Sequence, residues 1–238
     1  SDTFISIDNV YINNYAHGSG GGIKIEMSEY VMIYECLVYD NKATNAGGGT
    51  SVEDVVNIRL VCTRLIKNKA NMGAGMHIFT FSYVISVLNI YQENCASSMG
   101  GALFMANINV KIQPTVLLLY NSFHGNTAEN EATAMYIKFV DILNIYRIVL
   151  NLNKSNTILT LTYHTNRIYL SNVVVKKVSK AQILVKLTTA VAIFKNVRFG
   201  CPLPTYLDQM SDAHKIQGKF KLVFKCSKCK SNFYILEY

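Results

Sequence analysis

Apolar and polar residues alternate in short stretches along the chain, and each stretch follows a cluster of small residues. After the glycines at 20–22, residues 23–27 read Ile-Lys-Ile-Glu-Met, which alternates as a strand with one buried face does. Similar stretches follow the small-residue clusters at 47–49, 73–75, 100–101 and 133–134. The expected strands cover 23–27, 50–54, 76–80, 102–106 and 134–138, with further strand regions at 30–38, 55–65 and 83–91. No 3.6-residue period lies between them, so the pattern predicts an all-β chain.

The two sides of these expected strands change along the chain. In the first two strands one side is apolar and the other carries Lys24 or Glu53, so the apolar side faces the core. In the later strands the opposite side also becomes apolar, and this column comprises Phe79, Leu103, Met105, Met135 and Ile137. Solvent-facing columns rarely collect so many large apolar groups. We therefore expect a contact patch there, covered either by another segment, such as 202–224, or by a binding partner.

An asparagine followed two residues later by alanine or serine recurs every 26 or 27 residues, with one step of 32. The ladder consists of Asn14, Asn41, Asn68, Asn94, Asn126 and Asn153. An insertion around 111–115 accounts for the long step. A period near 26 with two or three short strands is typical of one coil of a parallel β-solenoid, in which equivalent side chains stack. The spacing therefore predicts that the amide of Asn41 lies directly over Asn14, with Asn68 over both.

A second ladder of small residues runs in phase with the first, seven or eight residues after each of the first four asparagines. It supplies the predicted corner glycines Gly21, Gly22, Gly48, Gly49, Gly75 and Gly101. Glycine permits positive φ and close approach between neighbouring coils, which the corners of a solenoid require. The two ladders together predict a single-stranded right-handed parallel β-helix of about seven coils over residues 1–200. Residues 201–238 are expected to form a small C-terminal cap that contains cysteines.

The Asn-x-Ala corner with a Gly-Gly strand opening resembles the repeats of polymorphic outer-membrane adhesins and of large ciliate and other protist surface proteins. The best copies are 14–25, 41–52 and 94–104, and the resemblance covers roughly residues 4–200. The tail, with Cys226-Ser227-Lys228-Cys229, looks like the start of a growth-factor-receptor-type cysteine-rich repeat. The resemblance implies a surface or extracellular protein.

Six cysteines leave several pairings open. Cys36 and Cys62 lie 26 residues apart, one coil, which favours a disulfide between adjacent coils. Their offsets from the following asparagine differ by one residue, so the alternative is that the two thiols fall out of register. Cys201, Cys226 and Cys229 provide one further disulfide and a leftover thiol. A zinc site lacks a second Cys-x-x-Cys pair, so we expect a disulfide cap and no metal.

Composition fits a strand-rich, folded chain, since half of the residues are hydrophobic and only 16% are charged. The net charge of +8 is concentrated in residues 120–238. This basic half is either a solvated face or a region that attracts acidic polysaccharide, anionic lipid or nucleic acid, although no nucleic-acid module is recognisable. No apolar run is long enough to span a membrane, and residues 1–7 already resemble a strand without a signal sequence. We expect a piece of a longer chain.

Candidate catalytic groups are few. Glu26 and Glu53 occupy the same position in successive strands and should stack on the outer side, where two acids can do acid–base work on a polysaccharide or share a cation. Neighbouring lysines at 24, 42 and 69 offer a purely structural explanation. The five histidines share no ladder position or ligand spacing, and the glycines at 18–22 lack the lysine of a phosphate-binding loop. Asn153 lies in a glycosylation sequon but coincides with the ladder.

The sequence therefore predicts a non-enzymatic structural or adhesive protein without cofactors, an elongated scaffold that forms a fibre or a cell-surface layer. Its expected partners are further copies of itself, other domains of the same long chain, or glycans. The alternatives are a polysaccharide-binding module and a polysaccharide-degrading β-helix enzyme.

Overall fold

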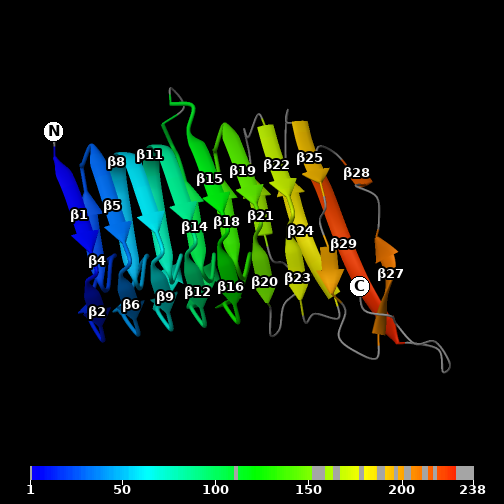
Figure 1. The fold of residues 1–238 in the computed structure, drawn as a ribbon, viewed down its shortest axis with the longest axis horizontal. Coiled ribbons are helices and arrows are strands. Elements are labelled where there is room, and N and C mark those ends of the chain that lie inside the picture. Colours follow the sequence, from blue (N-terminus) through cyan, green and yellow to red (C-terminus); the bar gives the residue numbers. More distant parts are fainter. Residues whose placement is uncertain are drawn as a thin grey trace.

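The chain winds as a parallel β-solenoid, in which short strands form walls that stack on the walls of the next coil (Figure 1). Among the described residues, walls 1 to 3 continue through the later coils and wall 4 is present in the first five. The computed structural model describes residues 2–109, 112–151, 159–162, 167–176, 180–186, 191–195, 198–200, 205–210, 214–216 and 219–228. Side chains are described within the first two ranges, for 167–175 and for residue 195. The described residues form strands and turns without any helix, so none of them forms a helix that could cross a membrane.

Walls 1 and 2 belong to one sheet of 16 strands. Wall 1 comprises β4 (Ile23–Glu26), the first parts of β8 (Thr50–Val61) and β11 (Met76–Val87), β14 (Leu103–Ala106), β18 (Met135–Lys138), β21 (Leu159–Thr162) and β24 (Lys180–Lys186). Wall 2 comprises β1 (Thr3–Ile7), β5 (Tyr30–Tyr34), the second parts of β8 and β11, β15 (Thr115–Leu119), β19 (Ile142–Tyr146), β22 (Arg167–Ser171) and β25 (Val191–Lys195). All of these strands pair in parallel.

Walls 3 and 4 are separate parallel sheets. Wall 3 comprises β2 (Val10–Ile12), β6 (Leu37–Tyr39), β9 (Arg64–Ile66), β12 (Ile90–Gln92), β16 (Ser122–His124), β20 (Val149–Asn151), β23 (Val174–Lys176) and β26 (Arg198–Gly200). Wall 4 comprises β3 (Tyr15–Ala16), β7 (Lys42–Ala43), β10 (Lys69–Met72), β13 (Cys95–Met99) and β17 (Thr127–Ala128). The predicted solenoid is therefore confirmed.

The last strands change direction. Strand β29 (Lys219–Lys228) pairs antiparallel with β24, and β27 (Thr205–Met210) and β28 (His214–Ile216) pair antiparallel with β29. These strands extend the same sheet at its C-terminal end, beyond the region of parallel coils (Figure 1).

The corners between walls use a left-handed backbone at fixed positions. Between walls 2 and 3 this position is filled in turn by Asp8, Glu35, Cys62, Leu88, Tyr120, Arg147 and Asn172, with φ between 50° and 58°. Such values are uncommon outside glycine. They persist here because the hydrogen bonds to the neighbouring coils fix the backbone, for example Glu35 N–H to Val61 O at 3.0 Å.

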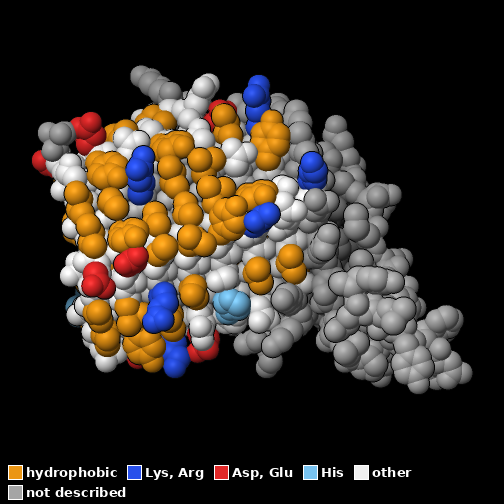
Figure 2. Space-filling view, in the orientation of Figure 1, with side chains coloured by type: hydrophobic (Ala, Val, Ile, Leu, Met, Phe, Trp, Pro, Cys, Tyr) orange, Lys and Arg blue, Asp and Glu red, His pale blue; other side chains and the backbone are white. Residues whose placement is uncertain are grey.

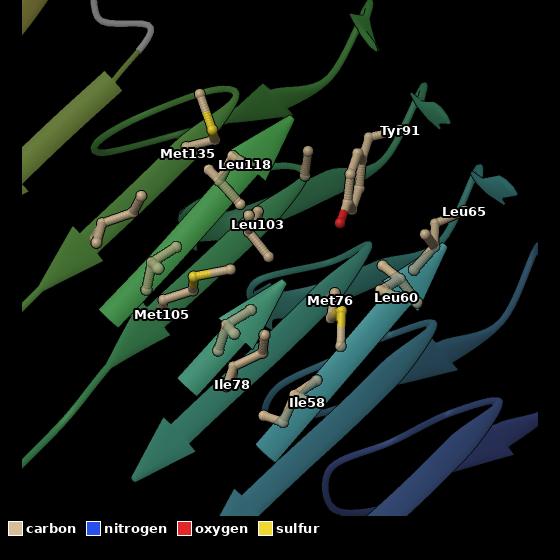
Figure 3. Close-up of a cluster of buried hydrophobic side chains, with 14 of the residues drawn as sticks. Ile58, Leu60, Leu65, Met76, Ile78, Tyr91, Leu103, Met105, Leu118 and Met135 are labelled. Atoms are coloured by element: carbon tan, nitrogen blue, oxygen red, sulfur yellow. The ribbon is translucent and has the colours of Figure 1, made fainter. Parts of the chain in front are cut away.

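The interior is filled by alternate side chains of the walls. In wall 2 the inward residues Val31, Ile58 and Val84 stack in successive coils and are almost fully buried. Figure 3 shows the same layering around Leu60, Met76 and Leu118, where side chains from walls 1, 2 and 3 meet. Each coil thus buries its apolar side against its own walls and against the coils on either side.

Two of the predicted glycines show why the corner before wall 1 needs small residues. A Cβ atom on Gly21 would lie 2.3 Å from Gly48 O, and one on Gly48 would lie 2.3 Å from Lys69 O. A Cβ atom on Gly22, Gly49, Gly75 or Gly101 would lie 2.3–2.8 Å from a backbone oxygen, which is also too close. The positive φ angles belong instead to the preceding residue of each cluster, for example Gly20 and Gly47. The predicted glycines are therefore needed because neighbouring coils approach too closely for a side chain. The left-handed backbone conformation belongs to other residues of the same clusters.

Candidate binding surface

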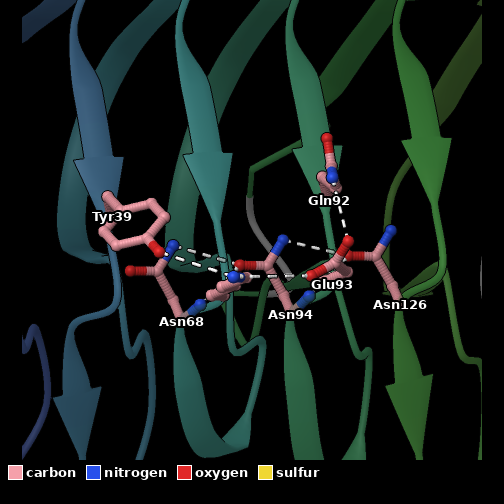
Figure 4. Close-up of polar contacts among 7 residues, drawn as sticks. Tyr39, Asn68, Gln92, Glu93, Asn94 and Asn126 are labelled. Carbon is pink, nitrogen blue, oxygen red and sulfur yellow. Dashed lines mark hydrogen bonds and ion pairs between the residues drawn. The ribbon is translucent and has the colours of Figure 1, made fainter.

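The asparagine ladder lies at the corner between walls 3 and 4, inside the solenoid. Each amide donates from Nδ2 to Oδ1 of the next asparagine, with distances of 2.9 Å from Asn14 to Asn41, 3.2 Å to Asn68, 3.0 Å to Asn94 and 2.9 Å to Asn126. Each Oδ1 also accepts the backbone N–H of the asparagine one coil back. Figure 4 shows the amide groups of Asn68, Asn94 and Asn126 in succession. The structure brings these five residues together; Asn153 lies outside the described residues. The buried amides of Asn41, Asn68 and Asn94 each make four hydrogen bonds, so this part of the ladder is structural and not a binding site.

A second internal ladder, which the sequence analysis missed, occupies the corner between walls 2 and 3. Asn121 Oδ1 accepts the backbone N–H of Asn89 at 2.9 Å, and Asn89 Oδ1 accepts that of Thr63 at 2.8 Å. Cys36 stands at the next level, with its N–H 3.4 Å from Thr63 Oγ1. These residues lie five positions before the first ladder, so the same spacing that revealed the first ladder would have revealed this one.

This second ladder explains why the predicted Cys36–Cys62 disulfide is wrong. Both cysteines are free thiols, and Cys36 is buried while Cys62 is half-buried. Thr63, and not Cys62, lies at the level of Cys36, because Cys62 occupies the left-handed corner position before it. The one-residue difference in offset therefore puts the thiols out of register. The remaining predicted partners, Cys201, Cys226 and Cys229, lie outside the residues whose side chains are described.

The predicted apolar contact patch is also corrected by the register of wall 1. Leu103 pairs with Met76 and Met135, and Met105 pairs with Ile78 and Ile137, so these columns point into the core (Figure 3). Leu103, Met105, Met135 and Ile137 are at most 1% exposed. The strand after Gly100 begins one residue later than expected, and a slip of one residue exchanges the two faces of a strand. Of the predicted patch, only Phe79 points outward.

The outward column of wall 1 is instead an aromatic stack. His77, Phe104 and Tyr136 succeed one another along it, with ring centroids 5.2 Å apart in both steps and planes within 18°. Phe104 and Tyr136 are buried because Met72 and Met99 of wall 4, together with Phe79, pack against their cluster. This stack is a small second core on the outside of wall 1 and leaves little surface for a ligand.

The acidic pair of wall 1 is arranged as predicted, one coil apart, since Glu26 pairs with Glu53 in the register. Lys24 Nζ lies 2.7 Å from Glu26 Oε1, and this hydrogen bond raises the pKa of Lys24. Ser51 Oγ donates to Glu53 Oε1 at 2.9 Å. Polysaccharide hydrolysis needs one carboxyl group as a proton donor and another as base or nucleophile. Here both carboxylates already have partners within their own strands.

Ser51, His77 and Glu53 do not form a nucleophilic triad. In such a triad the imidazole lies between the acid and the hydroxyl. Here the hydroxyl lies between the other two, because Ser51 Oγ contacts both Glu53 and His77 Nδ1, the latter at 3.2 Å. Ser51 is also fully buried and cannot meet a substrate.

Burial lowers the pKa of His77 from 6.5 to about 4, which predicts a pH-dependent stability. The unfolded chain takes up the proton near pH 6.5 and the folded chain only near pH 4, so the free energy of unfolding falls as pH decreases between these values. The expected loss is about 3 kcal/mol. Urea unfolding across this pH range should show a smaller fall for His77→Phe than for the unchanged chain. The variant His17→Phe, at an exposed histidine, should keep the full fall; equal curves for all three proteins would contradict the prediction.

A shallow groove of about 340 Å³ lies on wall 4. Lys42 and Lys69 line it at the same position of successive coils, and Cys95 follows at the next. Thr44, Asn71, Ser97 and Glu129 supply its other polar groups. Lys42 also lies 5.8 Å from the ring of Tyr15. The groove thus offers two cations, one carboxylate and several hydroxyl and amide groups beside the apolar side chains of Ala43 and Ala70.

The outer face of wall 2 is the surface whose composition is most unusual among the described residues. This name covers the alternate residues of β1, β5, β8, β11, β15, β19 and β22 that point away from the core. Most are apolar or aromatic: Ile5, Ile7, Tyr30, Met32, Tyr34, Val61, Tyr83, Ile85, Val87, Leu117, Leu119, Ile142, Tyr146 and Tyr169. The others are Thr3, Asn57, Arg59, Thr115, Asn144, Arg167 and Ser171. Figure 2 shows hydrophobic side chains gathered over the strands that Figure 1 labels β5, β8, β11 and β15.

The outer face of wall 2 carries no acidic side chain and only two basic ones at its described positions. Arg59 lies 5.9 Å from the ring centre of Tyr30, and at the edge of the face Arg147 lies 5.5 Å and 5.3 Å from the rings of Tyr120 and Tyr146. Ile5 and Ile7, at the N-terminal end of this face, are more than half exposed. Most outward residues of the middle strands are half-buried, because neighbouring side chains of the same face pack against them. A contiguous and partly exposed apolar surface of this kind is typical of interaction sites in other proteins.

Comparison with family models, curated proteins and solved structures finds no match for this chain. Within the part of the chain that the structure describes, no group of three His, Cys, Asp or Glu side chains could hold a metal ion. The chemistry of the surfaces themselves is therefore the basis for assigning a function.

Proposed function

We propose that the protein is a non-enzymatic structural or adhesive solenoid that holds its partner on the outer face of wall 2. The observation that supports this most directly is the nearly uncharged aromatic and aliphatic surface that runs across seven stacked strands. Removing such a surface from water stabilises a complex by about 25 cal/mol per Å² before the costs of association.

The solenoid suits a scaffold because its repeating backbone holds every outer side chain at a fixed spacing. Columns such as Tyr34, Val61 and Val87 stand at the interstrand distance of about 4.8 Å. The saturated asparagine ladder and the buried core keep the wall rigid, so binding orders few side chains. A rigid, regular surface of this kind favours attachment to another extended surface and assembly into a fibre or layer. An extracellular or cell-surface location is part of the proposal and rests on the resemblance of the repeats to surface proteins.

A polysaccharide-binding role is the second candidate, and two features favour it. Tyr30, Tyr83 and Tyr146 present rings on the same face as the amides of Asn57 and Asn144. Separately, the groove of wall 4 offers hydroxyl, amide and ammonium groups. A polysaccharide-degrading enzyme would act instead at Glu26 and Glu53.

Adsorption of the full chain tests the proposal. We expect the protein to be retained on apolar beads or on insoluble polysaccharide, and the double variant Ile85→Lys/Leu117→Lys to lose most of this retention. Ile12→Lys is the matched control, since Ile12 is an exposed isoleucine on wall 3. Loss of retention in the control as well, or no retention of the unchanged chain together with no self-association, would contradict the proposal. Release of sugar from the polysaccharide that disappears in Glu53→Gln would favour the enzyme instead.

A further inference from the structure

We infer that the outer face of wall 2 binds a second copy of this chain, face to face, around a two-fold axis that runs along β15. This inference rests on the proposed function and names the partner. It follows from where the charges lie on the face and from the size of the face.

The centre of the face is an uncharged window. The outward residues of β11, β15 and β19 are Tyr83, Ile85, Val87, Thr115, Leu117, Leu119, Ile142, Asn144 and Tyr146. Arg59 lies on β8, one strand before this window, and Arg167 lies on β22, one strand after it. The window is therefore bounded by one guanidinium group on each side, at equal distance from β15. An interface centred on β15 buries the apolar window and leaves both cations toward its edges.

The charges also select the direction of the axis. Two identical sheets can pack face to face around a two-fold axis that lies in the plane of the interface. This axis can run either across the strands or along them. An axis across the strands, through their middle residues, places Arg59 opposite Arg59 of the second copy, and like charges out of water are strongly unfavourable. An axis along β15 avoids this, because it places β8 opposite β22 and β11 opposite β19.

With the axis along β15, the facing residues are complementary. Arg59 and Tyr169 are both the middle outward residues of their strands, so each guanidinium meets a tyrosine ring of the other copy. Tyr169 is 38% exposed and so has a ring face free for this contact. Arg167 meets Asn57, which carries no charge. On the axis itself, Leu117 and Leu119 meet their own copies and form the apolar centre.

The area is adequate for a stable dimer. Seven strands, from β5 to β25, overlap in this arrangement, with five residues each. Strand β25 lies one strand beyond the outer face as defined above, and its exposed Lys195 stands at the edge of the interface, opposite the uncharged Tyr34 of the other copy. At about 4.8 Å between strands and about 3.3 Å per residue, they cover roughly 550 Å² in projection. The accessible area of a surface made of side chains exceeds its projection, which brings it toward the roughly 800 Å² per partner of standard interfaces. The two sheets would pack about 10 Å apart, as stacked sheets do.

Sedimentation of the full chain over a range of concentrations tests the inference. We expect a monomer–dimer equilibrium whose Kd rises about 100-fold in Leu117→Lys, because two ammonium groups would then face each other across the axis. Arg59→Gln should raise the Kd about tenfold, since each dimer contains two Arg59–Tyr169 contacts. Ile12→Lys, on wall 3, should leave it unchanged. A chain that stays monomeric, or a dimer that Leu117→Lys does not weaken, overturns the inference.

Cross-linking locates the axis. With Cys62, Cys95, Cys201, Cys226 and Cys229 replaced by serine and only the buried Cys36 kept, Leu117→Cys should be joined between copies by a short bismaleimide, whereas Ile12→Cys should not. Cross-linking of both variants to the same extent overturns the arrangement. A protein that is monomeric in sedimentation but still adsorbs through the outer face of wall 2 would refute the inference that a second copy binds this face. The proposed function would then still hold. Failure of both adsorption and self-association would refute the proposed function itself.

Discussion

Replacing Asn68 with alanine is expected to lower the free energy of unfolding by about 3–5 kcal/mol. The Asn68 side chain is fully buried and makes four hydrogen bonds. Its Nδ2 donates to Asn94 Oδ1 and to Val38 O, both at 3.0 Å, and its Oδ1 accepts from Asn41 N at 3.0 Å and from Asn41 Nδ2 at 3.2 Å. Alanine removes all four and leaves buried groups of two neighbouring coils without these partners. Unfolding in urea, followed by circular dichroism, measures the loss.

Asn71→Ala is the matched control for this prediction. Asn71 lies three residues further along the chain, in β10 of wall 4, where it points outward and is exposed, and its Oδ1 accepts one hydrogen bond, from Ser97 Oγ at 3.0 Å. Exposed substitutions of this kind usually change stability by less than about 0.5 kcal/mol. Similar losses in Asn68→Ala and Asn71→Ala would show that the ladder does not stabilise the coils as its geometry implies.

The ladder could be predicted from the sequence because one residue type recurs with a strict spacing. The amide of asparagine is both donor and acceptor, so a column of asparagines satisfies itself only when the coils stack, and Asn14, Asn41 and Asn68 therefore reveal the geometry directly. The glycine clusters carry the same information, because only small residues fit where backbone oxygens approach so closely.

The outer face of wall 2 was missed because wall 2 is apolar on both sides. Alternation identifies a buried face only where the other face is polar, and in β15 the sequence Thr-Val-Leu-Leu-Leu offers no such contrast. The ladder spacing supplies the missing information: Tyr30, Asn57, Tyr83, Thr115 and Ile142 follow one another at the same intervals as the asparagines from Asn41 to Asn153. Applying those intervals to wall 2 would have separated its inner and outer columns.

The sequence also holds too little information to predict the register of wall 1, for a related reason. In β4 and β8, charged residues such as Lys24 and Glu53 mark the outer side, but β14 reads Leu-Phe-Met-Ala and contains no polar residue. Its outer side is apolar because Met72 and Met99 of wall 4 pack against it, which is a contact between distant segments that alternation does not reveal. Glycine and alanine are also interchangeable at this corner, since Gly49 and Ala102 occupy equivalent positions.

Comparing Met105→Lys with Phe79→Lys distinguishes the two registers experimentally. The alternation in the sequence places both residues in one outward column and predicts similar effects. The structure places Met105 in the core, fully buried between Ile78 and Ile137, and Phe79 on the outside beside Glu53 of the preceding coil. An ammonium group in the apolar core has no partner, so Met105→Lys should cost about 4 kcal/mol or more. Phe79→Lys should cost about 1 kcal/mol at most, because its charge reaches water and lies near a carboxylate.

The free energies of unfolding of both variants, from urea titrations at neutral pH, decide between these expectations. A large loss in Met105→Lys with a small one in Phe79→Lys supports the observed register. Large losses in both variants would mean that the cluster of Phe104 and Tyr136 needs an apolar side chain at position 79. In that case Phe79→Leu, which adds no charge, should keep the stability of the unchanged chain. Small losses in both would contradict the register, because a solenoid core filled by Ile78, Met105 and Ile137 cannot hold an unpaired charge at its centre without unfolding that coil.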